Sequence, residues 1–200
     1  MPDFSYEKQA KNNGFKFICG VDEAGRGPLA GPVCAAAVIL PENCVIEGLN
    51  DSKKISEKKR EMLFDIITEK AIAYSIAYGT LEEIEKYNIL EATYIAMNRA
   101  IEGLALKADF ALIDGNRVPK GITVPCETII KGDSKSFSIA AASILAKVTR
   151  DRLMLEYDQK YPEYLFAKHK GYGTKAHYDA IKQHGVCEIH RLSFLKNVLG

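Results

Sequence analysis

Two adjacent acidic residues, Asp22 and Glu23, end an apolar segment that is typical of a β-strand, and a second such segment follows. The first segment covers residues 16–22, the second covers 33–40, and a turn rich in glycine and proline joins them. Because neighbouring side chains on a strand point to opposite faces, only one of the two acids can face the core of a sheet. A carboxylate buried beside aliphatic side chains is costly unless it is paired or bound to a cation. The segment therefore predicts metal or polar-backbone chemistry rather than packing alone.

The periodicity of the remaining apolar residues predicts an α/β protein with a mixed central sheet flanked by helices. Further strands are expected over residues 71–78, 109–114 and 127–132, and helices over 57–70, 89–105, 138–161 and 174–184. Small residues at the start of the longest helix would let it lie close to the sheet. The 200 residues fit a single domain, 1–200, with a helical appendage from about residue 162.

Polar residues mark where several of these helices begin. Ser56 and Thr174 are positioned as N-caps, and Thr80 with Glu83 makes a capping-box signature. The helix over 57–70 is expected to bury one apolar face, made of Met62, Leu63, Ile66 and Ile67.

Composition bounds the cellular setting. No apolar run approaches the roughly 20 residues that a membrane-spanning helix needs. The first fifteen residues are polar and contain no apolar signal core, so we expect a cytoplasmic protein with no membrane partner. The five cysteines form no CxxC pair, which predicts reduced, mostly buried thiols and gives a structural zinc site little support.

The net charge of +1 conceals an asymmetry along the chain. Residues 1–115 carry 13 Lys and Arg against 18 Asp and Glu, whereas residues 116–200 carry 14 against 8. A basic surface in the second part would favour a polyanionic partner, although on charge alone an ordinary solvated face is the simpler interpretation. The basic residues concerned are Lys131, Lys135, Lys147, Arg150, Arg152, Lys168, Lys170 and Lys175.

Predicted strands deliver carboxylates at three places: Asp22 with Glu23, then Asp114, then Asp133. If these strands are neighbours, four acids meet at one edge of the sheet, where hard cations readily offset their repulsion. Two Mg²⁺ or Mn²⁺ ions that hold the attacking and leaving oxygens would serve phosphodiester hydrolysis. A general-acid and general-base pair, as in glycosidases, is the rival use of these acids. Each acid alone could also be an ordinary turn residue.

The turn made of Gly25, Arg26 and Gly27 could bring backbone groups to a ribose 2′-OH and a guanidinium to a phosphate. Tyr172 stands among glycines and lysines, which would let its ring stack on a sugar or base. An ordinary hairpin turn and a basic loop are the alternatives.

Ser52 and Lys53 lie in a short polar loop that could bind phosphate, or that simply leads into a helix. The four histidines lack close metal spacing and are interpreted as surface or structural residues: His169, His177, His184 and His190.

Six segments of the sequence together closely resemble bacterial ribonuclease HII. They follow one another in the family's order from about residue 17 to 195, and the first and fourth are highly specific in combination. The segments are Gly20–Val33 (GVDEAGRGPLAGPV), Asp114–Asn116 (DGN), Lys131–Lys135 (KGDSK), Ser138–Arg152 (SIAAASILAKVTRDR), Lys170–Thr174 (KGYGT) and His190–Phe194 (HRLSF).

The resemblance implies a ribonuclease H-like fold with a C-terminal helical region, and endonucleolytic hydrolysis of RNA in RNA–DNA hybrids. It also implies incision 5′ of a single ribonucleotide embedded in duplex DNA, which leaves 5′-phosphate and 3′-hydroxyl ends. Ribonucleotide excision repair and primer removal are the expected roles. The related ribonuclease HIII has a lysine in place of Arg26 and an extra N-terminal domain, and this sequence shows neither.

The same resemblance assigns site residues. The metal-binding catalytic set, for Mn²⁺ or Mg²⁺, is Asp22, Glu23, Asp114 and Asp133. The substrate-binding set is Gly25, Arg26 and Gly27 on the 2′-OH at the RNA–DNA junction and Tyr172 on the deoxyribose after it, to which we add Ser52 and Lys53. The expected partners are RNA–DNA hybrids and ribonucleotide-containing duplex DNA, and the protein is expected to be a monomer.

Two alternatives stay open at this level. A junction resolvase of similar fold would cut branched all-DNA substrates, which a reader of the 2′-OH should ignore. A non-catalytic module that binds hybrids would gain nothing from four anions that face phosphates.

Overall fold

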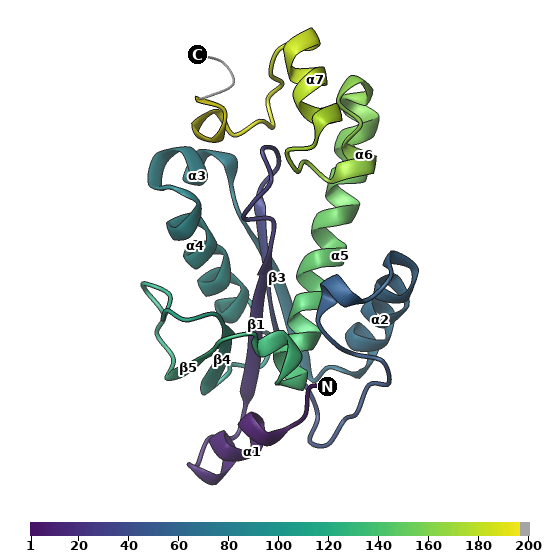
Figure 1. Cartoon of the computed structure of the whole chain (residues 1–200). Helices are drawn as coiled ribbons and strands as arrows, with labels where there is room; N and C mark the ends of the chain where they lie inside the picture. The colour runs from purple at the N-terminus through teal and green to yellow at the C-terminus, as the bar shows by residue number, and fades with distance from the viewer. Residues whose placement is uncertain (197–200) are drawn as a thin grey trace.

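Within residues 1–196, which the computed structural model describes, the chain forms a five-stranded sheet in the order β3-β2-β1-β4-β5 (Figure 1). The strands are β1 (Ile18–Ala24), β2 (Val33–Ile39), β3 (Ala73–Gly79), β4 (Phe110–Asp114) and β5 (Cys126–Ile129). The first three pair antiparallel, whereas β4 is parallel to β1 and β5 is parallel to β4. The predicted mixed sheet is confirmed, and β1 lies at its centre.

Helices cover both faces of this sheet (Figure 1). Among residues 1–196, no helix combines the length and apolar character needed to cross a bilayer. The α-helices are α1 (Ser5–Asn12), α2 (Glu57–Lys70), α3 (Leu81–Tyr87), α4 (Ile89–Glu102), α5 (Phe137–Lys160), α6 (Phe166–His169) and α7 (Lys175–His184). Short 3-10 helices are η1 (Ser52–Lys54), η2 (Gly132–Ser134), η3 (Pro162–Tyr164) and η4 (Leu192–Phe194).

Helix α5 lies directly against β1 because small residues face each other there. A Cβ at Gly20 would collide with the main chain of Ser138, so glycine is what allows this close approach. The first turns of α5 bury Ala140, Ala141 and Ser143. The predicted close packing of this helix is confirmed, and it brings polar groups of α5 to the end of β1.

Helix α4 packs on the opposite face, where Ala96, Met97 and Ala100 join the core around Val21 and Ile113. The capping box that precedes α3 is confirmed in both directions. The hydroxyl of Thr80 accepts the N–H of Glu83, and the carboxylate of Glu83 accepts the N–H of Thr80. The predicted N-caps Ser56 and Thr174 are confirmed as well.

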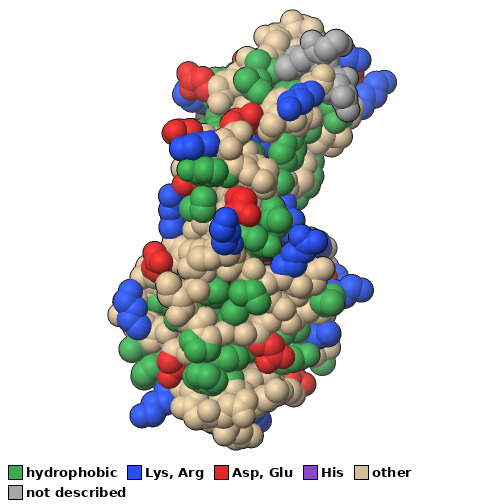
Figure 2. All heavy atoms as spheres, turned by 90° about the vertical axis from the view of Figure 1, so that its left-hand side faces the viewer, with side chains coloured by type: hydrophobic (Ala, Val, Ile, Leu, Met, Phe, Trp, Pro, Cys, Tyr) green, Lys and Arg blue, Asp and Glu red, His purple; other side chains and the backbone are tan. Residues whose placement is uncertain are grey.

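The C-terminal lobe, residues 162–195, lies beyond the end of the sheet, above the turn between β1 and β2 (Figure 1). It has its own apolar cluster, in which Phe166, Ile181 and Leu195 pack against Leu29 and Ala30. In the space-filling view from the α4 side, the surface narrows between the body around the sheet and this lobe (Figure 2). That the appendage belongs to one domain with the rest stays a prediction.

Two expected boundaries are wrong. Strand β1 continues to Ala24, so Glu23 lies inside it rather than after it, while Asp22 lies within the strand as predicted. The strand expected over 127–132 stops at Ile129, because Lys131 adopts a left-handed backbone (φ 57°) and opens η2.

One predicted apolar face is also wrong in part. Met62 is 58% exposed, while Leu63 and Ile67 form the buried side of α2. Met62 precedes Leu63 by one residue and therefore lies off this buried side of the helix, toward solvent.

All five cysteines are free, but only Cys19 and Cys34 are fully buried, and burial raises the pKa of each of these thiols to about 12.

Candidate active site

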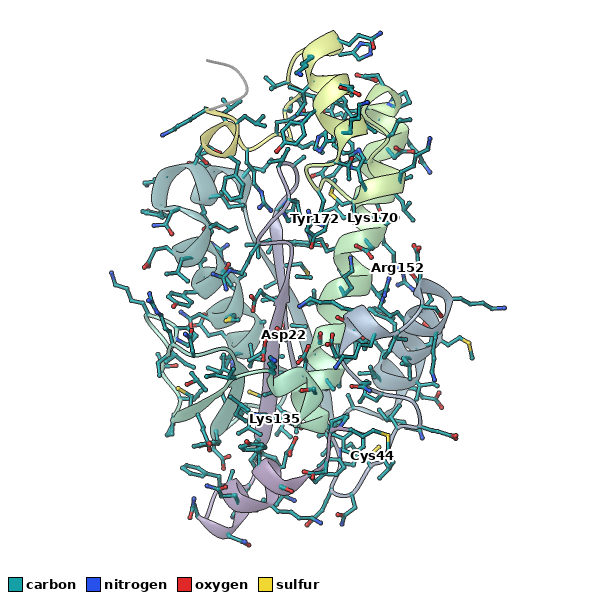
Figure 3. The ribbon with its side chains drawn as sticks, viewed as in Figure 1. Asp22, Cys44, Lys135, Arg152, Lys170 and Tyr172 are labelled. Carbon is teal, nitrogen blue, oxygen red and sulfur yellow. The ribbon has the colours of Figure 1, made fainter. Side chains whose placement is uncertain are left out.

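A cavity of about 350 Å³ opens where β1 ends and the glycine turn (Gly25–Gly27) begins. Nine of the ten residues predicted for the site line it: Asp22, Glu23, Asp114, Gly25, Arg26, Gly27, Ser52, Lys53 and Tyr172. Ser143 and Lys147 of α5 line it too. Figure 3 shows Asp22 midway along the molecule between β1 and α5, with Tyr172 higher up near the base of the C-terminal lobe. Segments far apart in the sequence thus meet around one opening.

Asp22 sits on the α5 side of the sheet, where its strand partner is Ala36. The residue is 5% exposed, and one carboxylate oxygen accepts the N–H of Glu23 at 2.7 Å. Burial raises the pKa of Asp22 well above its usual range, and the negative charges of Glu23 and Asp114 raise it further. No lysine or arginine of residues 1–196 forms a salt bridge with this carboxylate.

Glu23 points to the α4 side, which confirms that the two acids face opposite ways. It lines a second cavity of about 320 Å³, together with Thr93 and Tyr94 of α4. Burial raises the pKa of Glu23, the guanidinium of Arg26 at 3.4 Å opposes the rise, and the charge of Asp114 adds to it. Glu23 and Asp114 line both cavities, so the acids lie between them.

A short hydrogen bond connects Asp114, at the end of β4, to the loop that carries Asp133. The N–H of Gly132 donates to Oδ1 of Asp114 at 2.6 Å. A Cβ at Gly132 would lie 2.6 Å from the terminal methyl of Ile139 and 3.3 Å from Oδ1 of Asp114, so a side chain here would force Ile139 to shift. Asp133 is buried on η2 but does not line either cavity beside Asp114.

Asp51 is a fifth acid here, and the sequence pattern did not single it out. Burial raises the pKa of Asp133, and the charges of Asp114 and Asp51 raise it further. For Asp51 itself, burial acts in the same direction, but a hydrogen bond from the Lys53 N–H and the charges of Lys54 and Lys53 outweigh it, so that its pKa falls. Only the fold brings Asp51 to Asp133.

The residue types of the acid cluster (Asp22, Glu23, Asp114 and Asp133) fit a hard divalent cation. In the side-chain positions found here, no three His, Cys, Asp or Glu residues within 1–196 form a group that could hold a metal ion. Three of the four acids nevertheless have raised pKa values, first because burial disfavours the charged form and then because the carboxylates repel one another. Carboxylate oxygens are the ligands that Mg²⁺ and Mn²⁺ prefer, and a bound cation would remove this repulsion. Asp22, Glu23 and Asp114 are the members that face the cavity.

The loop with Ser52 and Lys53 is held in place from two sides. The hydroxyl of Ser143 on α5 donates to the hydroxyl of Ser52 at 3.0 Å. Arg60 of α2 donates to the carbonyl of Ser52 at 2.9 Å. The loop therefore places Lys53 at the cavity from a backbone held on two sides.

The glycine turn is held by a buried arginine that the sequence pattern did not reveal. The guanidinium of Arg191 donates to the carbonyls of Gly25 (2.6 Å), Arg26 (2.9 Å) and Gly31 (2.8 Å). The side chain is fully buried, and burial together with the nearby charge of Arg150 lowers the pKa of Arg191 to about 9. A planar fork of donors suits three carbonyls that a compact ammonium could not reach together.

Arg150 of α5 does the same for the next stretch of chain. It donates to the carbonyls of Ala30 (3.0 Å), Pro32 (3.1 Å) and Lys170 (3.0 Å). At Gly25 the backbone has φ 98°, and a Cβ would collide with the Arg150 side chain. Glycine is therefore required at this position for two independent reasons.

The predicted basic surface is smaller than the sequence suggested. Arg150 is 1% exposed and serves backbone carbonyls, so its assignment to a charged surface is wrong. Lys147 pairs with Asp151 at 2.7 Å, and Arg152 pairs with Glu61. On the face shown in Figure 2, positive and negative side chains are interspersed.

Tyr172 faces the glycine turn from the C-terminal lobe. A Cβ at Gly27 would lie 3.6 Å from a ring carbon of Tyr172, and the tyrosine is 44% exposed. The ring is thus both close to the turn and accessible to a ligand in the cavity. Of the four histidines, His184 is exposed and the other three are buried in the lobe, which confirms that they are surface or structural residues.

Comparison with known proteins decides the family. The family model described as Ribonuclease HII matches residues 19–197. The chain belongs to the ribonuclease HII family. A ribonuclease HII of Endomicrobium trichonymphae is 57% identical over 191 residues, which are 96% of this chain and 91% of the relative. As a member of this family the protein is a ribonuclease H, an endonuclease for RNA–DNA hybrids.

Solved structures agree on the fold. Ribonuclease H2 from Pyrococcus horikoshii superposes with a TM-score of 0.75 at 28% identity and covers 89% of this chain and 93% of its own. Bst-RNase HIII, solved in complex with Mn²⁺, has a TM-score of 0.70 at 17% identity and covers 92% of this chain and 69% of its own. The ribonuclease H-like fold predicted from the sequence is confirmed.

Proposed function

We propose that this ribonuclease H incises duplex DNA on the 5′ side of a single embedded ribonucleotide, as well as cutting longer RNA–DNA hybrids, and leaves 5′-phosphate and 3′-hydroxyl ends. Such incision would begin ribonucleotide excision repair and would serve primer removal. The observation that carries the proposal is the single cavity that joins three carboxylates, the glycine turn and Tyr172. Its parts match the three things such a substrate offers: a scissile phosphate, a 2′-OH and a following deoxyribose.

The acid cluster would hold Mg²⁺ or Mn²⁺, with Asp22, Glu23 and Asp114 facing the cavity and Asp133 beside Asp114. The bound metal supplies activation of water and stabilisation of negative charge on the leaving 3′-oxygen. The crowding of buried negative charge supports this assignment, and Bst-RNase HIII, which shares the fold, was solved with Mn²⁺.

The remaining residues bind and orient the substrate. Backbone groups of the glycine turn would hydrogen-bond the ribose 2′-OH, which is both donor and acceptor. Arg191 donates to the carbonyls of Gly25 and Arg26 and so fixes the turn, whose N–H groups and remaining carbonyl lone pairs would meet the ribose. Tyr172 would pack on the deoxyribose after the junction, and Lys53 would meet a phosphate.

The test is incision of a DNA duplex that contains one ribonucleotide, in Mg²⁺ or Mn²⁺ and then in EDTA. We expect one cut 5′ of the ribonucleotide, its loss in EDTA, and no cutting of an all-DNA duplex or of a branched all-DNA junction. Asp114→Asn should abolish cutting while binding to the duplex largely remains. Cutting of the branched DNA would instead favour a junction resolvase, and binding without any cutting would favour a non-catalytic module.

Two further statements remain predictions about the protein in the cell. We propose that it acts as a monomer, because one chain supplies every residue assigned to the site. Light scattering, which measures the mass in solution, tests this proposal. We also propose a cytoplasmic location, which cell fractionation tests.

A further inference from the structure

A chain of buried histidines runs through the C-terminal lobe and ends on the backbone of Tyr172. Nε2 of His177 lies 3.0 Å from Nε2 of His190, and Nδ1 of His177 lies 3.0 Å from the carbonyl oxygen of Tyr172. At the other end, the N–H of Cys187 donates to Nδ1 of His190 at 2.9 Å. His177 is 0% and His190 4% exposed.

The hydrogen-bond partners dictate where each proton sits. A carbonyl only accepts, so Nδ1 of His177 carries a proton and its Nε2 is an acceptor. The proton between the two rings must therefore belong to Nε2 of His190, and Nδ1 of His190 is then free to accept from Cys187, as observed. Both rings are neutral in this arrangement, and burial agrees, since it lowers the pKa of His177 to about 4.

Tyr172 lies in the loop of residues 170–174, and His169 supports this loop from its other side. Its Nε2 donates to the carbonyl of Tyr164 at 2.8 Å, which leaves Nδ1 to accept the N–H of Gly171 at 3.2 Å. The rings of His169 and His177 stack at 4.5 Å. The residue before Tyr172 is thus held by one histidine and the carbonyl of Tyr172 itself by another.

The loop so held is strained and is connected to the site. Lys170 and Gly171 both have left-handed backbones, with φ 51° and 84°. The carbonyl of Gly171 accepts the N–H of Leu29 at 2.8 Å, just beyond the glycine turn. A conformation of this kind persists only where its surroundings determine it.

We propose that His177, oriented by His190, is a positioning residue that sets Tyr172 against the glycine turn and so determines selectivity for the junction after a ribonucleotide. The inference rests on the proposed role of Tyr172. His177 touches no substrate: it acts through one hydrogen bond to the main chain of the residue that does.

Two substitutions at one position separate this hydrogen bond from simple space-filling. In His177→Asn, the amide nitrogen lies near the place of Nδ1 and can still donate to Tyr172. In His177→Gln, the amide lies near the place of Nε2, so the contact with His190 is kept and the donor to Tyr172 is lost. His184→Gln, at an exposed position of the same helix, is the matched control.

The measurement is kcat/KM on a single-ribonucleotide duplex divided by kcat/KM on a long RNA–DNA hybrid. We expect His177→Gln to lower this ratio on the order of ten-fold, the size of one lost hydrogen bond. His177→Asn and His184→Gln should leave it within about two-fold. An unchanged ratio in His177→Gln, or an equal fall in His177→Asn, overturns the proposal.

A double-mutant cycle with Tyr172→Ala separates the role of Tyr172 from the positioning role of His177. If Tyr172→Ala alone leaves the ratio unchanged, the proposed role of Tyr172 is wrong, and the positioning role is overturned with it. If Tyr172→Ala lowers the ratio and His177→Gln then lowers it no further, His177 acts through Tyr172, as proposed. If the two losses multiply, His177 acts by another route and only the positioning role is overturned. Should His177→Gln fail to fold, His190→Phe removes the donor that orients His177, and an unchanged ratio there overturns the proposal.

Discussion

The acid cluster and the lobe junction bury ionisable groups in opposite ways. By lobe junction we mean the contact of the C-terminal lobe with residues 25–32, held by Arg150, Arg191 and the three buried histidines. In the acid cluster, burial and mutual repulsion raise the pKa values of Asp22, Glu23 and Asp133. At the lobe junction, two buried guanidinium groups donate to six backbone carbonyls, His177 and His190 share a hydrogen bond, and His169 bonds to backbone groups.

The difference separates a frame from a binding site. The lobe junction is complete without a ligand, so it can hold the glycine turn and Tyr172 in one arrangement before substrate arrives. The acid cluster is incomplete, and its unfavourable charge becomes favourable only when a cation enters. Substitutions and conditions that perturb one region test whether it is independent of the other.

The largest effect is expected from Asp22→Asn. Losing one carboxylate should reduce incision on the order of 10³-fold, the equivalent of about 4 kcal/mol of transition-state stabilisation. Without divalent ions the variant should be at least as stable as the parent, because a repelled charge is removed. Incision rates and urea denaturation in EDTA measure both, with the exposed Asp65→Asn as control. A rate above a tenth of the parent's would remove Asp22 from the catalytic set.

Arg191→Lys should weaken the frame. A single ammonium cannot reach three carbonyls, and two buried acceptors left without donors would cost about 2–4 kcal/mol of unfolding free energy. Urea denaturation measures the loss, and Arg152→Lys at the surface is the control. The stabilisation by Mg²⁺ should persist in folded Arg191→Lys. A loss below about 1 kcal/mol would show that these hydrogen bonds are replaceable by water.

Divalent ions should stabilise the acid cluster alone. At a hundred times its dissociation constant, Mg²⁺ or Mn²⁺ should add about 2.7 kcal/mol to the unfolding free energy of the parent protein. Asp114→Asn should lose most of this gain, while His177→Asn should keep it. Thermal denaturation over a range of ion concentrations is the measurement. Equal stabilisation of the parent and Asp114→Asn would place the ion elsewhere.

Acidification should affect the two regions in opposite directions. The folded-state pKa of His177 is lowered to about 4, so the stability that its neutral ring contributes is present above the ordinary value of 6.5 and is lost as the pH falls toward 4. The pKa of Asp22 is raised, so its contribution is complete below the ordinary value and is lost as the pH rises through the folded-state value.

In EDTA, the stability advantage of Asp22→Asn over the parent should therefore shrink from pH 7 to pH 5. The disadvantage of His177→Asn should shrink as well, by about 1–2 kcal/mol, because the parent is losing the histidine contribution. Urea denaturation at pH 7, 6 and 5 measures the difference in unfolding free energy between each variant and the parent. Differences that do not change with pH would show that neither group titrates differently in the folded state.

Much of the site could be predicted because short segments carried it. Asp22, Glu23 and the glycine turn are contiguous, and Asp114 ends a strand whose apolar pattern is plain in the sequence. Their common cavity follows from the parallel pairing of β1 with β4, which places the ends of both strands at one edge. The small residues at the start of α5 likewise predicted its close packing on β1.

The lobe junction could not be predicted, because its residues look like something else in the sequence. Arg150 resembles part of a basic face, and Arg191 lies more than 150 positions from the turn that it holds. In the acid cluster, too, Asp51 looks like an ordinary loop residue until the fold places it by Asp133. The spacing of the histidines in the sequence does not predict that they are hydrogen-bonded, since their contacts join separate turns of the lobe.

The sequence by itself determined the strand and helix types, the pairing of acids with a glycine turn, and the family, because these depend on neighbours along the chain. Only the tertiary structure decided which charges are satisfied. Whether a buried arginine finds carbonyls, or a buried aspartate finds other aspartates, depends on groups that folding brings from elsewhere. In this protein that difference separates the lobe junction, whose buried charges have partners, from the acid cluster, whose buried charges repel one another.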